Sequence, residues 1–147
     1  MLLQQLKSDL IISMKSGDAF SVSVLRMMIS ALNYEKIDKQ HELTDEEILA
    51  VLSREVKKRR EAVALYRQGN REELAAKEEK EITIIAVYMP KQMSDAKIRS
   101  DVEKILSGIS EADKLNFGRV MSTVMGVLKG KADGTLISQT VKELLGQ

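Results

Sequence analysis

The densest group of charged residues that could contact a ligand lies in residues 54–60, which hold five basic residues and one acidic residue. On a helix, Lys57, Lys58 and Arg60 would fall outside the apolar stripe and point to solvent. A basic helix face of this kind is suited to bind the phosphates of a nucleic acid. An ordinary solvated helix face is the alternative, because glutamates lie close by in the sequence. Arg59 would fall near the apolar stripe, where we expect a structural ion pair and a buried alkyl stem.

A second basic segment surrounds a glycine-containing turn near the C-terminus. Residues 114–142 hold five basic residues against one acidic residue, which gives a local net charge of +4. Gly130 lets the backbone turn tightly, and free amides at the start of the next helix would suit a phosphate. A plain helix–turn–helix corner with flanking lysines is the alternative. The candidate RNA-binding residues of this segment are Arg119, Lys129, Gly130, Lys131 and Lys142.

The sequence does not contain the residue types of a complete active site. The chain has no cysteine, which excludes disulfides, thiolate metal sites and cysteine nucleophiles. His41 is the one histidine, and it lies in a polar segment without partners for catalysis or metal binding, so we expect a surface role. The sequence has no glycine-rich phosphate loop, zinc signature or nucleophile elbow. We therefore expect no catalytic residue, no cofactor and no metal.

Composition restricts the class of protein. The 147 residues suit one domain or two small ones, and the low aromatic content of 3% argues against an all-β fold. The apolar runs are only a few residues long, far below the roughly 20 residues that cross a bilayer. The N-terminus has no basic leader or cleavage site, so we expect a cytoplasmic protein with no membrane partner. The net charge of +1 does not by itself predict a nucleic-acid partner, so only the distribution of charges can.

The spacing of apolar residues predicts an all-α fold, because they recur at three- and four-residue steps along nearly the whole chain. Pro90 cannot continue a helix interior and marks the expected boundary between two domains. The predicted organisation is an N-terminal four-helix domain in residues 1–90 and a small three-helix tail domain in residues 91–147. Between the first two helices of the tail we expect a loop that ends at about Asn116.

Local signals predict how some of these helices pack and end. The second helix carries apolar residues on two faces, one of which includes Met27 and Tyr34, as is typical of the central helix of a bundle. Asn70 follows a glycine and is expected to cap the fourth helix. Gly118 and Gly126 lie eight residues apart, a spacing that would also allow close helix packing.

Several segments, in order and well spaced, resemble the GatB/YqeY family. They are SREVKKRREA at residues 53–62, YRQGNR at 66–71, YMPKQMS at 88–94, and GRVM at 118–121 with KGKADG at 129–134. The resemblance covers essentially the full chain. It implies a helical N-terminal domain followed by a three-helix tail.

The tail of this family resembles the tail of the B subunit of the tRNA-dependent amidotransferase. That module engages the tRNA body away from the chemistry, and the resemblance brings the class of carbon–nitrogen ligases with glutamine as amido-N-donor. The parts that perform ligase and glutaminase chemistry have no counterpart in this sequence, so what carries over is RNA contact by Arg119 and the Lys129–Lys131 turn. Ser122, Gly126 and Val127 depart from the family pattern, and the missing lysine at Val127 weakens the phosphate interpretation.

These observations lead to one preferred hypothesis and two alternatives. The preferred one is an accessory module that binds tRNA or another structured RNA through the tail, with Lys57, Lys58 and Arg60 as a second patch. The first alternative is a protein–protein adaptor that docks through its helices without touching RNA. The second is a small amidotransferase in its own right, which the missing nucleophile disfavours.

Overall fold

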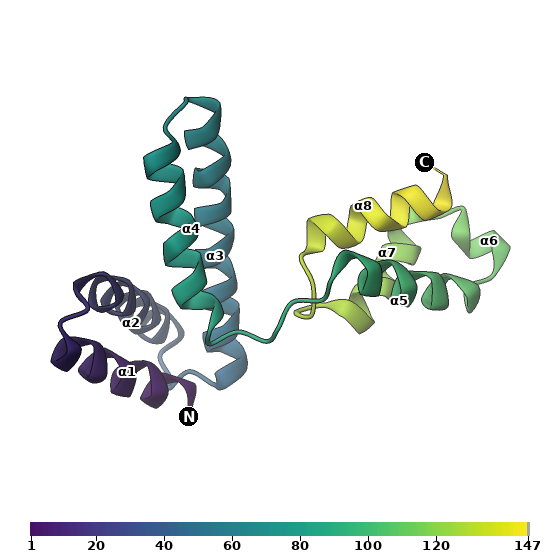
Figure 1. Ribbon diagram of the computed structural model, residues 1–147. Coiled ribbons are helices and arrows are strands. Elements are labelled where there is room, and N and C mark those ends of the chain that lie inside the picture. Colours follow the sequence, from purple (N-terminus) through teal and green to yellow (C-terminus); the bar gives the residue numbers. More distant parts are fainter. Residues whose placement is uncertain (147) are drawn as a thin grey trace. The chain divides into compact units, whose positions relative to one another are not determined.

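The computed structural model describes residues 1–146, and all regular structure in that range is helical (Figure 1). The prediction of an all-α fold is therefore confirmed. None of the helices in the described range is long and apolar enough to cross a membrane. The chain forms two compact units, Met1–Met89 and one that begins at Pro90, which we call the N-terminal and C-terminal units. The helices are α1 (Leu2–Ser16), α2 (Ala19–Lys39), α3 (Asp45–Gln68), α4 (Glu72–Ala86), α5 (Asp95–Ser107), α6 (Glu111–Lys114), α7 (Phe117–Leu128) and α8 (Gly134–Leu145).

Two helical hairpins build the N-terminal unit. α1 pairs with α2, and α3 pairs with α4 to form a longer hairpin whose far half extends beyond α1 and α2 (Figure 1). All four helices contribute to one core, which ends on α3 at Val56 and on α4 at Ile85. In the part of the hairpin between Val56 and Ile85, which includes the turn, α3 and α4 pack mainly against each other. The core residues are Leu6, Val24, Leu25, Met28, Leu32, Ile48, Val51, Leu52, Val56 and Ile85.

The second apolar face predicted for α2 is only partly covered: Val24 on that face is 1% exposed and Ala31 packs against the core. Tyr34 is 75% exposed and Met27 is 40% exposed. The expectation of a central helix buried on two sides is therefore wrong for these residues. The physical reason is that α1, α3 and α4 together cover one side of α2 and leave the other to solvent.

Capping side chains set most of the helix boundaries. Asp18 accepts the amide of Ser21 at 3.0 Å at the start of α2. Thr44 and Glu47 form a capping box at the start of α3. The cap predicted at Asn70 is wrong, because Asn70 adopts a left-handed conformation with φ of 56°, and the cap position is Arg71, directly before α4 begins at Glu72.

The C-terminal unit packs α5, α7 and α8 around its own small core. The core residues are Ile98, Val102, Leu106, Val120, Val124, Leu128, Ala132, Ile137 and Val141. The loop predicted before Asn116 contains one helical turn, α6, which Ser110 caps by accepting the amide of Asp113 at 3.2 Å. The tail thus has a short fourth helix that apolar periodicity does not reveal, because α6 has no buried residue.

Close helix packing at Gly118 and Gly126 is not observed. A methyl group built on Gly126 would meet no atom within 4 Å, and on Gly118 it would meet only the side chain of Asn116 at 3.3 Å. Neither glycine is needed to let another helix approach.

Candidate nucleic-acid interface

The turn between α7 and α8 presents two lysines on either side of a glycine. α7 ends at Leu128, whose carbonyl accepts the amide of Lys131 at 3.0 Å. Gly130 has a φ of +80°, a conformation that residues with a side chain rarely adopt. Lys129 and Lys131 are exposed, and neither forms an ion pair within residues 1–146. The turn therefore offers two cations that no neighbouring acid neutralises.

The start of α8 does not offer the free amides that the sequence predicted. The carboxylate of Asp133 accepts the amide of Thr135 at 2.8 Å and the amide of Leu136 at 3.3 Å. A carboxylate in this position takes the place that a phosphate would need at a helix N-terminus. The prediction of a phosphate site on these amides is wrong, and any phosphate contact at the turn falls to the lysine side chains.

Lys91 lies in the segment that packs against this turn, and sequence reasoning did not select it. The amide of Met93 donates to the carbonyl of Lys131 at 3.1 Å, which holds the segment after Pro90 on the turn. Lys91 is exposed two residues before Met93 and makes no ion pair within the described chain. Apolar periodicity gives no hint of this neighbourhood, because only the fold brings the two segments together.

Arg119 lies in the first turn of α7 and Lys142 in the last turn of α8, so both are at the helix ends away from the α7–α8 turn, and each has a contact of its own. The guanidinium of Arg119 lies 3.1 Å from Asp113, and both side chains are exposed. Hydrogen bonds from Ser110 and then from Arg119 hold the pKa of Asp113 below its usual range. The ammonium of Lys142 lies 5.7 Å from the centre of the Phe117 ring, a cation–π contact. Arg119 must leave Asp113 to bind a phosphate directly, and an exposed pair of this kind contributes only about 0–1 kcal/mol.

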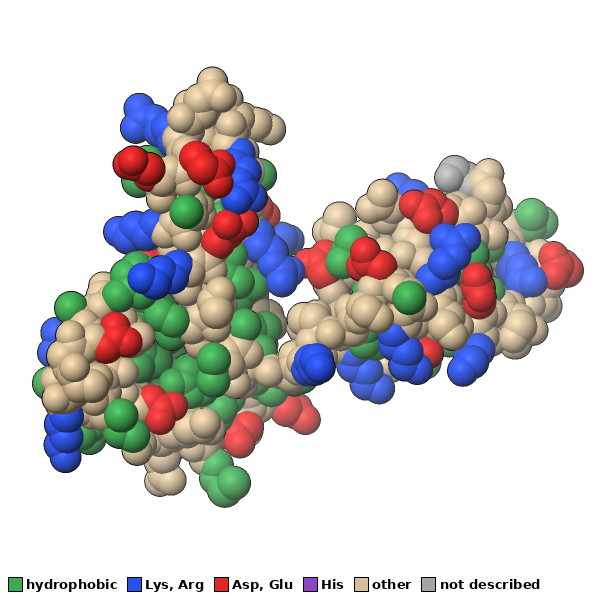
Figure 2. Space-filling model, viewed as in Figure 1, with side chains coloured by type: hydrophobic (Ala, Val, Ile, Leu, Met, Phe, Trp, Pro, Cys, Tyr) green, Lys and Arg blue, Asp and Glu red, His purple; other side chains and the backbone are tan. Residues whose placement is uncertain are grey.

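The predicted basic face of α3 is present but partly neutralised. Lys57, Lys58 and Arg60 are all exposed. Lys58 lies 3.2 Å from Glu55, whereas Lys57 forms no ion pair with any described residue. Figure 2 shows basic and acidic side chains interspersed along α3 and α4, whereas basic side chains predominate along the lower edge of the C-terminal unit in that view.

Arg59 forms the structural ion pair that the sequence predicted. It is 9% exposed, and its guanidinium lies 2.9 Å from Glu81 and 2.8 Å from Glu55. Burial alone would raise the pKa of Glu55, but hydrogen bonds from Arg59 and then Lys58 outweigh burial and lower it. Burial would likewise lower the pKa of Arg59, and its bonds to Glu55 and Glu81 raise it instead. Arg59 therefore joins α3 to α4 and does not belong to the exposed patch.

The single histidine lies away from these basic groups in the sequence and has a surface environment. The side chain of His41 is 52% exposed, with its Nε2 atom 3.5 Å from Glu47. Among residues 1–146, no three His, Cys, Asp or Glu side chains lie together so that they could hold a metal ion.

Three relatives have sequences similar to this chain. "Altered inheritance of mitochondria protein 41, mitochondrial" from Vanderwaltozyma polyspora is 31% identical over 111 residues, which are 74% of this chain and 60% of that protein. The protein of the same name from Pyrenophora tritici-repentis is 26% identical over 148 residues, which cover 98% of this chain and 81% of that protein. An uncharacterized protein of Schizosaccharomyces pombe is 31% identical over 90 residues, or 61% of this chain and 73% of the relative.

These names contradict the expectation of a cytoplasmic protein, since two of the relatives are named as mitochondrial. That expectation is wrong because its grounds, the short apolar runs and the composition of the first residues, do not distinguish a cytosolic protein from an organellar one. The match spans less than two thirds of the Vanderwaltozyma polyspora protein.

The family assignment rests on the whole chain and not on the basic turn alone. The Yqey-like protein family matches residues 3–145, which include both units and every segment that carried the resemblance. The all-α fold agrees with the expectation drawn from that resemblance. The chain belongs to the Yqey-like protein family.

Proposed function

We propose that this protein is an accessory module that binds tRNA or another structured RNA through the α7–α8 turn. The observation that carries the proposal is the pair Lys129 and Lys131, exposed on either side of Gly130 without an acidic partner among the described residues. Lys91 lies beside this turn, and Arg119 and Lys142 are further candidate contacts at the other ends of α7 and α8.

Other basic residues of the C-terminal unit differ from the turn lysines. Lys97 pairs with Asp101 at 2.8 Å, and Lys114 pairs with Glu111 at 2.7 Å. Arg99 lies within reach of both Glu103 and Glu143, at 3.5 and 3.3 Å. Each of these cations has an acid beside it. Lys104 on α5 is exposed without an ion pair among the described residues, so what distinguishes the turn is that Lys129 and Lys131 lie two residues apart with Lys91 beside them.

Phosphate contact by flexible lysines predicts a particular kind of binding. It is independent of base identity, because phosphates position a protein without reading sequence. It weakens as salt rises, because each phosphate contact releases condensed counterions. We expect micromolar or weaker affinity, since only a few cations take part.

Lys57, Lys58 and Arg60 form the proposed second patch, on α3 of the N-terminal unit. Because Glu55 neutralises Lys58 in part, we expect this patch to contribute less than the turn. Removal of its charges is expected to weaken RNA binding several-fold and not to abolish it.

Carbon–nitrogen ligase activity is not part of the proposal. The resemblance to the amidotransferase concerns its RNA-engaging tail, and the sequence offers no nucleophile set for glutamine hydrolysis. A catalytic role would require a partner that supplies those groups.

A charge-reversal experiment tests the proposal. The double variant Lys129→Glu/Lys131→Glu is titrated against unfractionated tRNA beside the wild-type chain. The matched control is Lys77→Glu/Lys104→Glu, which changes two exposed lysines on α4 and α5 and lowers the net charge by the same amount. The proposal predicts that the turn variant loses at least tenfold in affinity for tRNA and that the control loses clearly less. Equal losses would show that only net charge matters, and unchanged binding by the turn variant would overturn the assignment of the site.

A further inference from the structure

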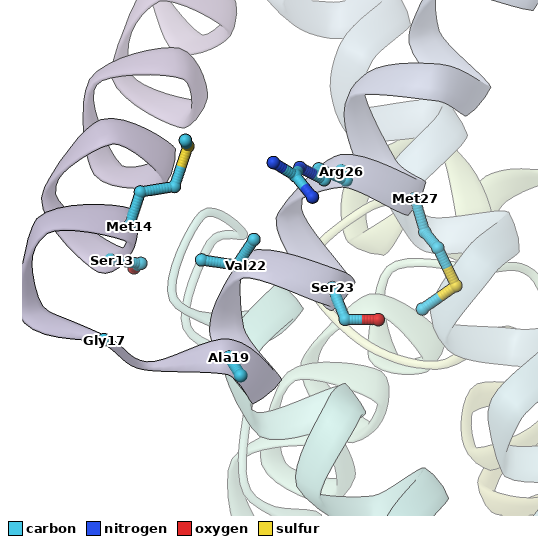
Figure 3. Close-up of a pocket in the computed structure, with 8 residues that line it drawn as sticks. All are labelled: Ser13, Met14, Gly17, Ala19, Val22, Ser23, Arg26 and Met27. Atoms are coloured by element: carbon cyan, nitrogen blue, oxygen red, sulfur yellow. The ribbon is translucent and has the colours of Figure 1, made fainter.

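A groove runs between the end of α1 and the first half of α2, in a region that the RNA proposal does not use. Figure 3 shows Met14 on α1 opposite Val22 and Arg26 on α2, with Met27 farther from Met14 and directed away from it, and Gly17 at the turn between the helices. We call this surface the α1–α2 groove.

The lining of the α1–α2 groove combines exposed apolar side chains with Ser13, Ser23 and Arg26. Met14 is 53% exposed and Met27 is 40% exposed, and Ile11, one turn before Met14, is 53% exposed. Large apolar side chains that gather at a hollow mark an interaction site more often than isolated exposed residues do. Methionine is common in grooves that accept helices, because its flexible thioether adapts to the shape of the partner.

Arg26 is the one charged side chain that lines the groove. It is exposed, and no ion pair or hydrogen bond of its side chain is found within residues 1–146. Three other arginines of the N-terminal unit are paired, Arg54 with Glu35, Arg59 with Glu81, and Arg67 with Glu72 and Glu79, whereas Arg71, which does not line the groove, has no ion pair among the described residues. Arg26 therefore offers an unused positive charge beside an apolar surface.

We propose that the α1–α2 groove docks an amphipathic helix of a partner protein that places an acidic residue against Arg26. The apolar face of such a helix would cover Met14, Val22 and Met27, in the manner of helix-in-groove recognition. A carboxylate on its flank would pair with the guanidinium, which has the donor geometry for a two-pronged contact.

Two other occupants fit the groove less well. A second copy of this chain, docked with two-fold symmetry on the groove, would bring the two Arg26 side chains toward one another. A nucleic acid would place phosphates against methionine and valine, which cannot accept or donate their hydrogen bonds. Charge complementarity therefore favours an acidic amphipathic helix, and this inference does not depend on RNA binding by the turn.

A selection from displayed peptides tests the proposal with a defined probe. The library contains helices of ~18 residues, or about five turns, with leucines at positions i, i+3, i+4 and i+7 and with Glu, Lys, Gln or Ala at the flanking positions. It is selected against the full chain. The proposal predicts enriched peptides with glutamate at one fixed position beside the leucines. Failure to enrich any peptide, or enrichment without an acidic position, would overturn it.

A charge swap then identifies the surface. Arg26→Glu is expected to weaken binding of the enriched peptide by about tenfold, which corresponds to roughly 1.4 kcal/mol. Replacing the selected glutamate of the peptide by lysine is expected to restore affinity for the Arg26→Glu chain. Lys104→Glu is the control, since it makes the same charge change on α5. Equal binding to the wild-type and Arg26→Glu chains would contradict the proposal, as would self-association of the wild-type chain that Arg26→Glu alters.

Discussion

The buried ion pair between α3 and α4 gives the sharpest prediction about stability. Arg59 and Glu81 have side chains that are only 10% and 9% exposed, and Glu55 is the second acid that holds the guanidinium. Removing one member of a buried pair leaves the other charged and poorly solvated, which costs about 3–5 kcal/mol. Arg59 and Glu81 lie next to Val56 and Ile85, the core residues at which the α3–α4 hairpin leaves the main core.

Three variants separate the contributions of Arg59 and Glu81 to the free energy of unfolding. Arg59→Met leaves Glu81 without its cation, and we expect the free energy of unfolding to fall by about 3–4 kcal/mol. Glu81→Leu leaves Arg59 bonded to Glu55 alone, and the loss of one charge-assisted hydrogen bond predicts a fall of about 2 kcal/mol. The double variant removes both charges and fills the space with apolar groups, so it should lie within about 1 kcal/mol of the wild type.

The tyrosines provide an assay that is specific to this unit. Tyr34, Tyr66 and Tyr88 are the only tyrosines, there is no tryptophan, and all three lie within Met1–Met89. Urea unfolding followed by tyrosine fluorescence therefore reports on the N-terminal unit alone. The reasoning is refuted if Glu81→Leu is as stable as the wild type, or if the double variant loses the sum of the two single losses.

Three further predictions concern a helix, a cap and the RNA surface. Gly126→Ala places a methyl group in open space within α7 and should raise the free energy of unfolding by about 1 kcal/mol, seen as a higher melting temperature by circular dichroism. Hydrogen bonds from Lys39 and then Thr44 lower the pKa of Glu47 to about 2, so its stabilising contribution is present above its ordinary value of 4.5 and is lost as the pH falls toward 2. Glu47→Gln should make the free energy of unfolding less dependent on pH in that window. Urea titrations between pH 2 and 4.5 that give the same pH dependence for the variant and the wild type would contradict this. Asp113→Asn releases Arg119 and removes one negative charge, so it should tighten tRNA binding about two- to fivefold in the titration described above, whereas weaker binding would argue that the ion pair positions Arg119 for RNA.

Apolar periodicity and capping residues predict much of this fold from the sequence. The all-α class follows from the three- and four-residue spacing. Thr44 and Glu47 mark the start of α3 because a capping box satisfies its own amides locally. The interior place of Arg59 follows from its position on the stripe of Leu52 and Tyr66. In each case the cause lies within a few turns of the residue concerned.

The errors arise where tertiary packing or a single backbone angle decides the outcome. Tyr34 is apolar and on a helix, yet no neighbouring element covers it. Asn70 has the right side chain for a cap, but its left-handed backbone places it in the turn. The amides at the start of α8 are taken by Asp133, which the sequence marks as a cap without showing that it excludes a phosphate.

The basic surface was only partly visible in the sequence for the same reason. Lys129 and Lys131 stand out because they flank Gly130. Lys91 does not, since its proximity to the turn depends on the hydrogen bond between Met93 and Lys131. Arg26 belongs to no sequence motif. Its significance depends on the groove around it and on the absence of an acidic partner for its guanidinium among the described residues.

The salt dependence of tRNA binding tests the central claim most directly. Each phosphate contact contributes about −0.7 to −0.9 to the slope of log K against log salt concentration. If Lys91, Lys129 and Lys131 each contact a phosphate, the wild-type slope should be about −2 to −3 or steeper. Lys129→Gln/Lys131→Gln should make that slope shallower by about 1.5–2. Binding that is insensitive to salt, or a slope that these substitutions leave unchanged, would contradict an RNA site at the α7–α8 turn.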